Sequence, residues 1–390
     1  MATHLRPVQS ELDPLDDMSL PGWLYFDSEF FEAEKHAFLK RAPQVVCHES
    51  EIAEPGEWRS LDYLGESVIV IRGDDGKIRA FANVCRHRGS RLVDGSGGCA
   101  KVLTCPYHAW SYARDGRLVG VPHREEYPGL DPERLGLAPV ALENWRGFLF
   151  VSLEPGAPSV AEMMAPYEVE IAPYRFEELR AIGRVTLRPR PLNWKTIADN
   201  YSDHLHIPIG HPGLTRLFGR NYRIEAEAHV DRMEGDLVDK DSANPSERAY
   251  QRLLPTADHL PESHRRKWLY FKLFPNVAFD IYPDQVDFMQ FLPVSSTETV
   301  IREISYALPD DRREMTAARY LNWRINRRVN AEDTELITRV QHGMQSPSYI
   351  AGPLGTSEVC LRSFAQKLRL LIPEARLASP PPPGWAKASG

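Results

Sequence analysis

Two short stretches decide how the first half of this chain must fold: Cys85-Arg86-His87 and, after a gap of 17 residues, Cys105-Pro106-Tyr107-His108. Each stretch supplies one thiol and one imidazole, with the spacing C-x-H in the first and C-x2-H in the second. Two thiolates and two imidazoles make a complete set of four metal ligands. The gap contains Asp94-Gly95-Ser96-Gly97-Gly98, a glycine-rich turn that lets the second stretch fold back on the first.

The distribution of ligands between the two stretches separates an iron-sulfur cluster from structural zinc. Zinc motifs usually pair like ligands, as in C-x2-C followed by H-x3-H, whereas each half here contributes one Cys and one His. In a Rieske [2Fe-2S] centre, two histidines replace two cysteines on one iron. We therefore expect Cys85, His87, Cys105 and His108 to hold such a cluster. Zinc, or buried cysteines with ordinary surface histidines, are the alternatives.

The residues around these ligands predict strands. Residues 67–72 and 78–84 are rich in β-branched and aromatic side chains and flank the turn at 73–76, and the second run leads directly into Cys85. Residues 110–112 and 113–118 indicate a strand, turn and strand just after His108. The cluster is therefore expected at the ends of two hairpins.

The composition is typical of an intracellular enzyme. At 390 residues, with 42% hydrophobic and 26% charged residues, the chain is long enough for two or three domains. Its net charge of -7 and pI near 6.0 give no basic surface for nucleic acid. No apolar run is long enough to span a membrane and the N-terminus lacks a signal-peptide core, so we expect a cytoplasmic protein. The odd set of five cysteines predicts free thiols at Cys47, Cys99 and Cys360.

A second group of candidate ligands lies in residues 193–211, NWKTIADNYSDHLHIPIGH. Since proline interrupts a helix, we expect a helix that begins near Pro191 and ends at Pro208. His206 would then lie on its last turn and His211 in the loop beyond. Two imidazoles near one helix end can bind one iron, although a solvated helix end with incidental histidines has the same pattern.

Acidic residues accompany these histidines. On a continuous helix, Asp199, Asp203 and His206 share one face, so a carboxylate there can accept the second N–H of the imidazole and orient it. His204 is a rival ligand, but it is rotated away from this face.

An iron bound by two histidines needs a carboxylate to complete a facial triad with open positions. A helix expected from Pro309-Asp310-Asp311 to about Gln341 offers Asp333, whose face also carries Val329, Leu336, Ile337 and Val340. An aspartate on an apolar face is costly unless it is paired or bound to metal, so Asp333 is the preferred ligand. Glu332 is the competitor, and a buried salt bridge of Asp333 is the structural alternative.

Taken together, these motifs resemble those of the α subunit of the Rieske non-heme iron oxygenases, the aromatic-ring-hydroxylating oxygenase family. The resemblance extends from about Gly22 to Pro373 and rests on three ordered motifs. They are C-x-H with C-x2-H, then N-W-K followed by D-N and D-x2-H-x4-H, and finally an E-D pair followed by Gln341-His342-Gly343-Met344.

The resemblance implies an α+β fold with an N-terminal all-β Rieske domain and a C-terminal helix-grip (START/Bet v1-like) catalytic domain with a long antiparallel sheet. Strand-like runs at 268–274, 277–282, 287–292 and 299–306 permit this sheet as a meander. We expect a helical segment at 1–42, the Rieske domain at 43–160, the catalytic domain at 161–378 and a proline-rich, disordered tail at 379–390. Residues 214–261, longer than an ordinary connection, are expected to include a lid.

The resemblance also implies a role for each ligand. The inner iron of the cluster is expected on Cys85 and Cys105, the outer iron on His87 and His108, and catalytic Fe(II) on His206, His211 and Asp333. Asn200 matches an asparagine close to the iron. Asp203 matches the bridging acid that links a cluster histidine of one subunit, here His108, to His206 of its neighbour. Such a link implies a head-to-tail ring, commonly a homotrimer.

The implied activity is oxygenation of a small molecule with O2. The sequence contains neither a dinucleotide fingerprint nor the cysteine spacing of a plant-type ferredoxin, so a separate NAD(P)H-dependent reductase, with or without a ferredoxin, must supply electrons. We expect hydroxylation of an aromatic or similarly apolar compound, on a wall formed by Trp268, Tyr270, Phe271, Phe279 and Tyr282. Oxidative demethylation of a quaternary amine is the alternative, because aromatic faces also attract cations. A Rieske electron carrier is the non-enzymatic alternative.

Overall fold

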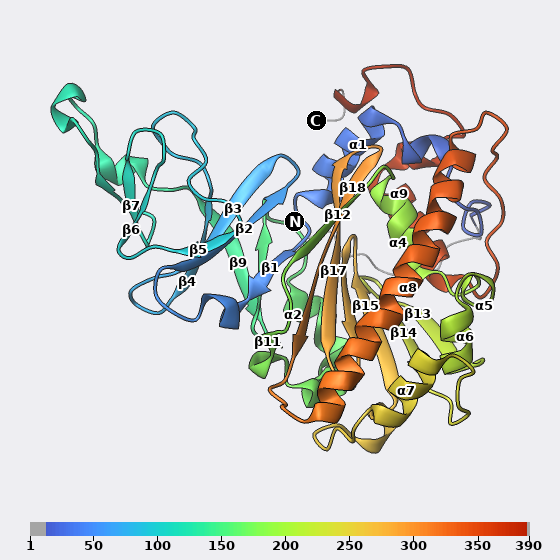
Figure 1. Ribbon diagram of the computed structural model, residues 1–390. Coiled ribbons are helices and arrows are strands. Elements are labelled where there is room, and N and C mark those ends of the chain that lie inside the picture. Colours follow the sequence, from blue (N-terminus) through green and yellow to red (C-terminus); the bar gives the residue numbers. More distant parts are fainter. Residues whose placement is uncertain (1–12, 388–390) are drawn as a thin grey trace. The chain divides into compact units, whose positions relative to one another are not determined.

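The computed structural model describes residues 13–387, which divide into two compact units (Figure 1). The smaller unit comprises residues 40–162 and 176–181, and the larger unit comprises the chain up to Leu39, Met163–Arg175 and the residues from Ile182 onward. The domain boundaries expected above stay predictions. The expected N-terminal segment and proline-rich tail lie partly outside the described residues.

The smaller unit consists mainly of antiparallel strands. Its seven-stranded sheet has the order β1-β10-β9-β4-β3-β2-β5, and a three-stranded sheet has the order β6-β7-β8. The strands are β1 (Gln44–His48), β2 (Glu57–Tyr63), β3 (Glu66–Arg72), β4 (Ile78–Ala82), β5 (Ser96–Gly98), β6 (Val102–Thr104), β7 (Ser111–Ala113), β8 (Leu118–Gly120), β9 (Pro139–Trp145), β10 (Phe148–Ser152) and the short β11 (Arg180–Ala181). The two predicted hairpins are confirmed as β3-β4 and β7-β8.

The larger unit contains one long antiparallel sheet. Its strands lie in the order β12-β18-β17-β16-β15-β14-β13. They are β12 (Thr186–Arg190), β13 (Tyr222–Ala226), β14 (Val230–Asp236), β15 (Lys267–Leu273), β16 (Val277–Ile281), β17 (Val286–Ser295) and β18 (Glu298–Ala307). The predicted meander is confirmed as β15 to β18. Residues 214–261, expected to include a lid, contain the hairpin β13-β14 and helix α7, and the lid itself stays a prediction.

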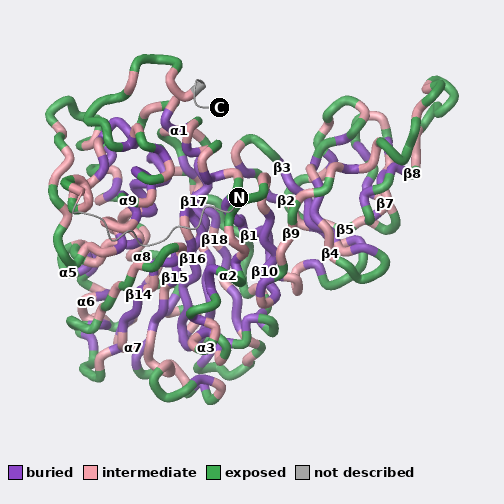
Figure 2. Tube along the Cα trace, turned by 180° about the vertical axis from the view of Figure 1, so that it is seen from behind, coloured by how far each residue is buried: buried purple, intermediate pink, exposed green. Residues whose placement is uncertain are grey.

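Helices cover this sheet, and α8 lies across it (Figure 1). The helices are α1 (Ser28–Glu34), α2 (Val160–Met164), α3 (Glu168–Ile171), α4 (Trp194–Ser202), α5 (Ile207–Gly210), α6 (Pro212–Phe218), α7 (Pro245–Leu253), α8 (Arg313–Met344) and α9 (Val359–Leu371). Ala318 and Ile325 of α8 belong to the same buried cluster as Trp268 and Tyr282 of the sheet side. Buried residues are concentrated in the central strands (Figure 2). The predicted α+β class is confirmed.

Candidate functional site

The two cysteine loops of the smaller unit share one backbone geometry. In each loop the cysteine N–H donates to the carbonyl five residues later, at 2.8 Å, and the cysteine carbonyl accepts from the N–H four residues later, at 3.0 Å. That fourth residue is left-handed in both loops, with φ of 73° at Gly89 and 57° at Ala109. Glycine adopts this conformation freely, whereas alanine does so only where the surrounding structure holds it. The repeated turn projects one cysteine and one histidine from each loop.

The four side chains of these loops fit a Rieske cluster. Cys85 and Cys105 are only 3% and 2% exposed, while the rings of His87 and His108 are half-buried, with centroids 4.7 Å apart. Nδ1 of His87 is buried and has no hydrogen-bond partner among the described residues. A buried ring nitrogen without a partner is costly, and coordination of a metal removes that cost. The thiols therefore suit the inner iron and the imidazoles the outer one.

The environment of Cys105 favours the charged form of its thiol. Burial acts to raise the pKa of Cys105, but the backbone N–H groups of Tyr107 and His108 outweigh it and hold that pKa below its ordinary value. The hydroxyl of Tyr112 lies 3.3 Å from Sγ of Cys85 and accepts from the Arg86 N–H at 2.9 Å. Hydrogen bonds to the sulfurs are one means by which a protein adjusts the potential of such a cluster.

The segment that carries His206 and His211 differs from its prediction. Helix α4 ends at Ser202 and does not reach Pro208, which instead occupies the first turn of the new helix α5. Proline fits a first turn because its missing N–H would have no helical partner there. The expected common helix face of Asp199, Asp203 and His206 is therefore absent. Asp199 instead accepts a 2.6 Å hydrogen bond from the Tyr25 hydroxyl.

Asp203 still reaches His206, through a turn. Its carboxylate accepts from the Leu205 N–H at 2.9 Å and from the His206 N–H at 3.1 Å, as in an Asx turn. The same carboxylate lies 2.7 Å from Nδ1 of His206. The predicted contact is correct, but a side-chain turn produces it. His204 lies outside the group that converges on Asp333.

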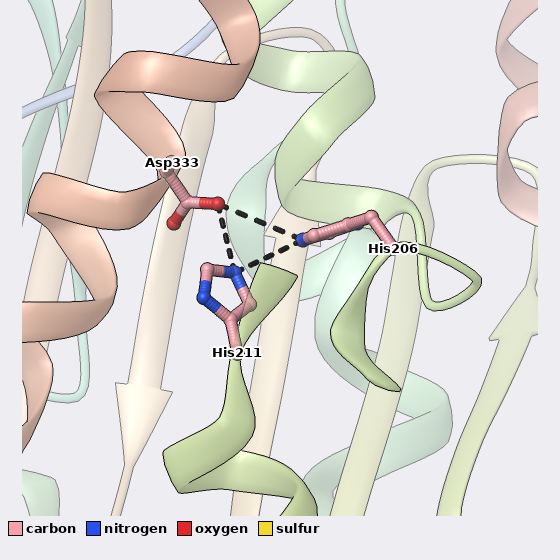
Figure 3. Close-up of side chains that lie close together, drawn as sticks. All are labelled: His206, His211 and Asp333. Carbon is pink, nitrogen blue, oxygen red and sulfur yellow. Dashed lines mark hydrogen bonds and ion pairs between the residues drawn. The ribbon is translucent and has the colours of Figure 1, made fainter. Parts of the chain in front are cut away.

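His206, His211 and Asp333 converge on one point (Figure 3). The two Nε2 atoms are 3.1 Å apart, and Oδ1 of Asp333 lies 2.9 Å from Nε2 of His211 and 3.6 Å from Nε2 of His206. Two imidazoles and one carboxylate on the same side of a point form the facial set that iron takes in oxygenases, with further positions left open. The three side chains come from the start of α5, the start of α6 and the middle of α8.

A second layer of hydrogen bonds orients these three side chains. Nδ1 of His206 faces Asp203, and Nδ1 of His211 lies 3.0 Å from Glu332. Asn200 donates to Oδ1 of Asp333 at 2.7 Å. Carboxylates in this layer fix the ring so that the other nitrogen faces the metal. Glu332, the competing ligand of the sequence, therefore supports His211 from behind.

The predicted burial of the helix face around Asp333 is only partly correct. Ile337 is buried, but Val340 is 46% exposed and Asp333 itself is half-buried.

Neighbouring side chains shift the pKa values of the groups at this point. Burial acts to lower the pKa of His206, but the hydrogen bonds to Asp203 and Asp333 outweigh it and raise that pKa to about 9. Burial acts to raise the pKa of Asp333, but hydrogen bonds from both histidines hold it at about 2. The acidic and basic side chains thus stabilise each other's charged forms before a metal binds.

A cavity of about 90 Å³ adjoins the three side chains. Because strand residues alternate between faces, the register places Tyr270, Asp280 and Asp287 in one row across β15, β16 and β17, and all three line the cavity. Tyr282 and Tyr222 line it as well.

The predicted aromatic wall is correct for two of its five residues. Tyr270 and Tyr282 line the cavity, but Trp268 does not, and Phe271 and Phe279 pair with each other on the opposite face of the sheet. Asp280 and Asp287 also line the cavity and were not predicted from the sequence. The alternation of Tyr270 with Phe271 is the one local signal that could have separated the two faces.

Comparison with known proteins identifies both units. Residues 42–139 match the Rieske [2Fe-2S] domain, and residues 176–374 match the catalytic domain of the ring hydroxylating alpha subunit. The chain belongs to the family of Rieske oxygenase α subunits. It is an oxidoreductase whose cofactors are a Rieske [2Fe-2S] cluster and a non-heme iron.

Several members of this family are similar over most of the chain. The oxygenase subunit of carnitine monooxygenase from Acinetobacter baumannii (strain ATCC 19606) is 30% identical over 85% of this chain and 86% of its own. The oxygenase subunit of glycine betaine monooxygenase from Pseudomonas aeruginosa (strain PAO1) is 33% identical over 51% of this chain and 46% of its own. A solved quaternary ammonium Rieske monooxygenase, characterised for carnitine oxidation and inter-subunit electron transfer, has the same fold, with a TM-score of 0.77. The two proteins are 24% identical, and the match covers 93% of this chain and 98% of the other.

Across residues 13–387, no helix combines the length and the apolar character that crossing a membrane requires. The cytoplasmic location stays a prediction.

Proposed function

We propose that this chain is the oxygenase subunit of a multicomponent monooxygenase that oxidises a quaternary ammonium compound at a carbon bonded to nitrogen. The observation that carries the proposal is the cavity beside His206 and Asp333, which combines tyrosine rings with buried carboxylates. Tyrosine faces and carboxylates both attract a cation and suit a purely apolar ring poorly. The aromatic substrate expected from the sequence assumed an apolar wall, and the similarity to carnitine and glycine betaine monooxygenases also favours the quaternary amine.

In this proposal the chain holds two metal groups. Cys85, Cys105, His87 and His108 would hold the [2Fe-2S] cluster, and His206, His211 and Asp333 would hold Fe(II). When bound, the cluster supplies single electrons and the iron supplies sites for O2 beside the substrate. One oxygen atom would enter the substrate and the other would leave as water. The hydroxylated carbon would then separate from nitrogen, giving an aldehyde and a less substituted amine.

The residues around the iron position its ligands and the substrate. Asp203 and Glu332 lie at Nδ1 of the two histidines, so each ring is held with Nε2 toward the metal position, where a bound metal ion would displace a proton. The Asn200 amide holds the Asp333 carboxylate in place. The tyrosine rings that line the cavity would surround the ammonium group.

Asp203 would also connect this subunit with a neighbour. We propose a head-to-tail homotrimer in which Asp203 links His206 to His108 of the neighbouring subunit, with a separate reductase, with or without a ferredoxin, as electron donor. Asp203 is half-buried, and Leu205 and Ile209 beside it are 47% and 86% exposed, which suits a surface that another subunit covers. Inter-subunit electron transfer is described for a quaternary ammonium monooxygenase of this fold.

Metal content and product analysis test the proposal. The purified chain should contain about three irons and two sulfides, whereas a simple carrier would contain about two irons and a zinc-stabilised module would be colourless. With a surrogate reductase and NAD(P)H, quaternary amines should give an amine and an aldehyde in proportion to O2 consumed, and Asp333→Ala should abolish both. Ring-hydroxylated product from an aromatic acid, without turnover of any amine, would overturn the proposal.

A further inference from the structure

The cavity beside the three convergent side chains is lined by acids without basic partners inside it. Asp280, Asp287 and Glu303 are among the lining residues, and none of the described residues around this cavity is a lysine or an arginine. Asp280 and Asp287 are buried, at 8% and 6% exposure. Buried carboxylates without a cation are costly, so a protein rarely retains two of them side by side without a use.

The polar partners of Asp280 and Asp287 are neutral. Asp280 accepts hydrogen bonds from the hydroxyls of Tyr201 and Tyr282, and Asp287 accepts from Nε2 of Gln285 at 2.8 Å. Burial raises the pKa of Asp280 to about 6 and, together with the charges of neighbouring aspartates, the pKa of Asp287 to about 8. A bound cation would return both groups to their charged form.

Two basic residues of the same sheet, Lys272 and Arg188, are already paired with acids. Lys272 lies on the same face of β15 as Tyr270, but its ammonium is 2.9 Å from Asp231 and donates to the carbonyl of Ala198 at 3.3 Å. Arg188 forms an ion pair with Glu303, the acid at the β18 side of the cavity.

The two imidazoles of the site are matched in the same way. His206 and His211 are held by Asp203, Glu332 and Asp333. Among the described residues that line this cavity, no lysine or arginine is therefore present to receive an anionic group of a ligand.

We infer that the substrate is an organic cation that carries no carboxylate, a conclusion that rests on the function proposed above. Carnitine and glycine betaine are zwitterions, and a site for either would need a partner for the carboxylate as well as for the ammonium group. Here a carboxylate would meet Asp280 and Asp287, and like charges in a desolvated site repel strongly. The tyrosine rings and the two aspartates suit a methylated ammonium group attached to a neutral or cationic remainder.

Calorimetric binding to the iron-loaded chain tests the inference with three probes of similar size. Choline is a cation without a carboxylate, glycine betaine adds the carboxylate, and 3,3-dimethylbutan-1-ol is the neutral isostere of choline. We expect choline to bind about tenfold or more tightly than either of the others. Glycine betaine binding as tightly as choline would overturn the inference and leave the proposed function standing. Equal binding of the neutral isostere, or absence of choline binding, would overturn both.

Matched variants show whether choline binding depends on the acids of this cavity or on the loss of any buried negative charge. Asp280→Asn and Asp287→Asn should weaken choline binding about tenfold and leave binding of the neutral isostere unchanged. Asp284→Asn is the control, because Asp284 is also a buried acid but bonds to Tyr250 and does not line the cavity. Iron content and thermal unfolding of each variant show whether it is folded. If all three variants weaken choline binding equally, the assignment of this cavity is wrong.

Discussion

The buried ion pair between Lys195 and Glu34 allows a direct test of what stabilises the position of α4. Nζ of Lys195 lies 2.7 Å from Oε1 of Glu34, and both side chains are fully buried. Trp194 donates to the other oxygen of Glu34 at 3.1 Å. The ammonium also lies over the rings of Tyr25, Phe30 and Trp194, at 5.3–5.5 Å from their centroids. The pair therefore ties the first turn of α4 to α1 of the same unit.

The change Lys195→Met should be strongly destabilising. It leaves Glu34 buried with Trp194 as its remaining donor, and removal of one partner of a buried pair costs about 3–5 kcal/mol. For a domain of this size that corresponds to a fall in Tm of about 6–20 °C. Adding Glu34→Leu should recover most of the loss, since apolar replacements of both partners are often neutral or stabilising.

The loss should also depend on pH. Burial raises the pKa of Glu34 above its ordinary value, and Lys195 opposes that rise. Without the lysine, the folded protein binds a proton at Glu34 more tightly than the unfolded chain does. Stability of the variant should therefore fall as pH rises through the folded pKa of Glu34, so the destabilisation should be larger at pH 8 than at pH 5.5.

Scanning calorimetry of the iron-loaded proteins measures these effects. Lys35→Met is the matched control, because Lys35 forms an exposed pair with Glu32 that contributes roughly 0–1 kcal/mol. The reasoning fails if Lys195→Met lowers Tm no more than this control does. It also fails if the double variant is no more stable than the single one.

Four further predictions concern the two metal centres and the cavity. His206→Ala should lower iron from about three to about two per chain, while His204→Ala should leave three, as iron analysis would show. Asp203→Asn should leave both metals bound at excess iron but abolish coupled O2 consumption with the native reductase; surviving activity would exclude the bridge. Tyr112→Phe should lower the cluster potential by about 40–80 mV in a redox titration, since it removes a hydrogen bond worth about 1–2 kcal/mol to Cys85. Choline affinity should rise severalfold between pH 6.5 and 9 as Asp287 ionises, with no change for the neutral isostere.

Local patterns were sufficient to predict many of the elements. The central strands were predictable because their alternation and turn residues are properties of adjacent positions. Helix α8 was predictable for the same reason, since its apolar residues recur with the helical period over many turns and the pattern ends at recognisable residues. Pro208 was misread because a proline is compatible both with the end of one helix and with the first turn of the next. Only the contacts of Asp203 with the backbone that follows decide between them.

The amino-acid sequence alone establishes the kind of metal chemistry, because ligand types and their spacing in Cys85 to His108 lie within single loops and need no knowledge of distant contacts. It also supplies the histidines and Asp333 as candidates. The tertiary structure alone decides what surrounds them. Tyr270, Asp280 and Asp287 come together through strand register, which depends on pairing between separate segments and has no signature in any one of them. The charge of the cavity, and with it the inferred substrate class, therefore follows from the folded sheet.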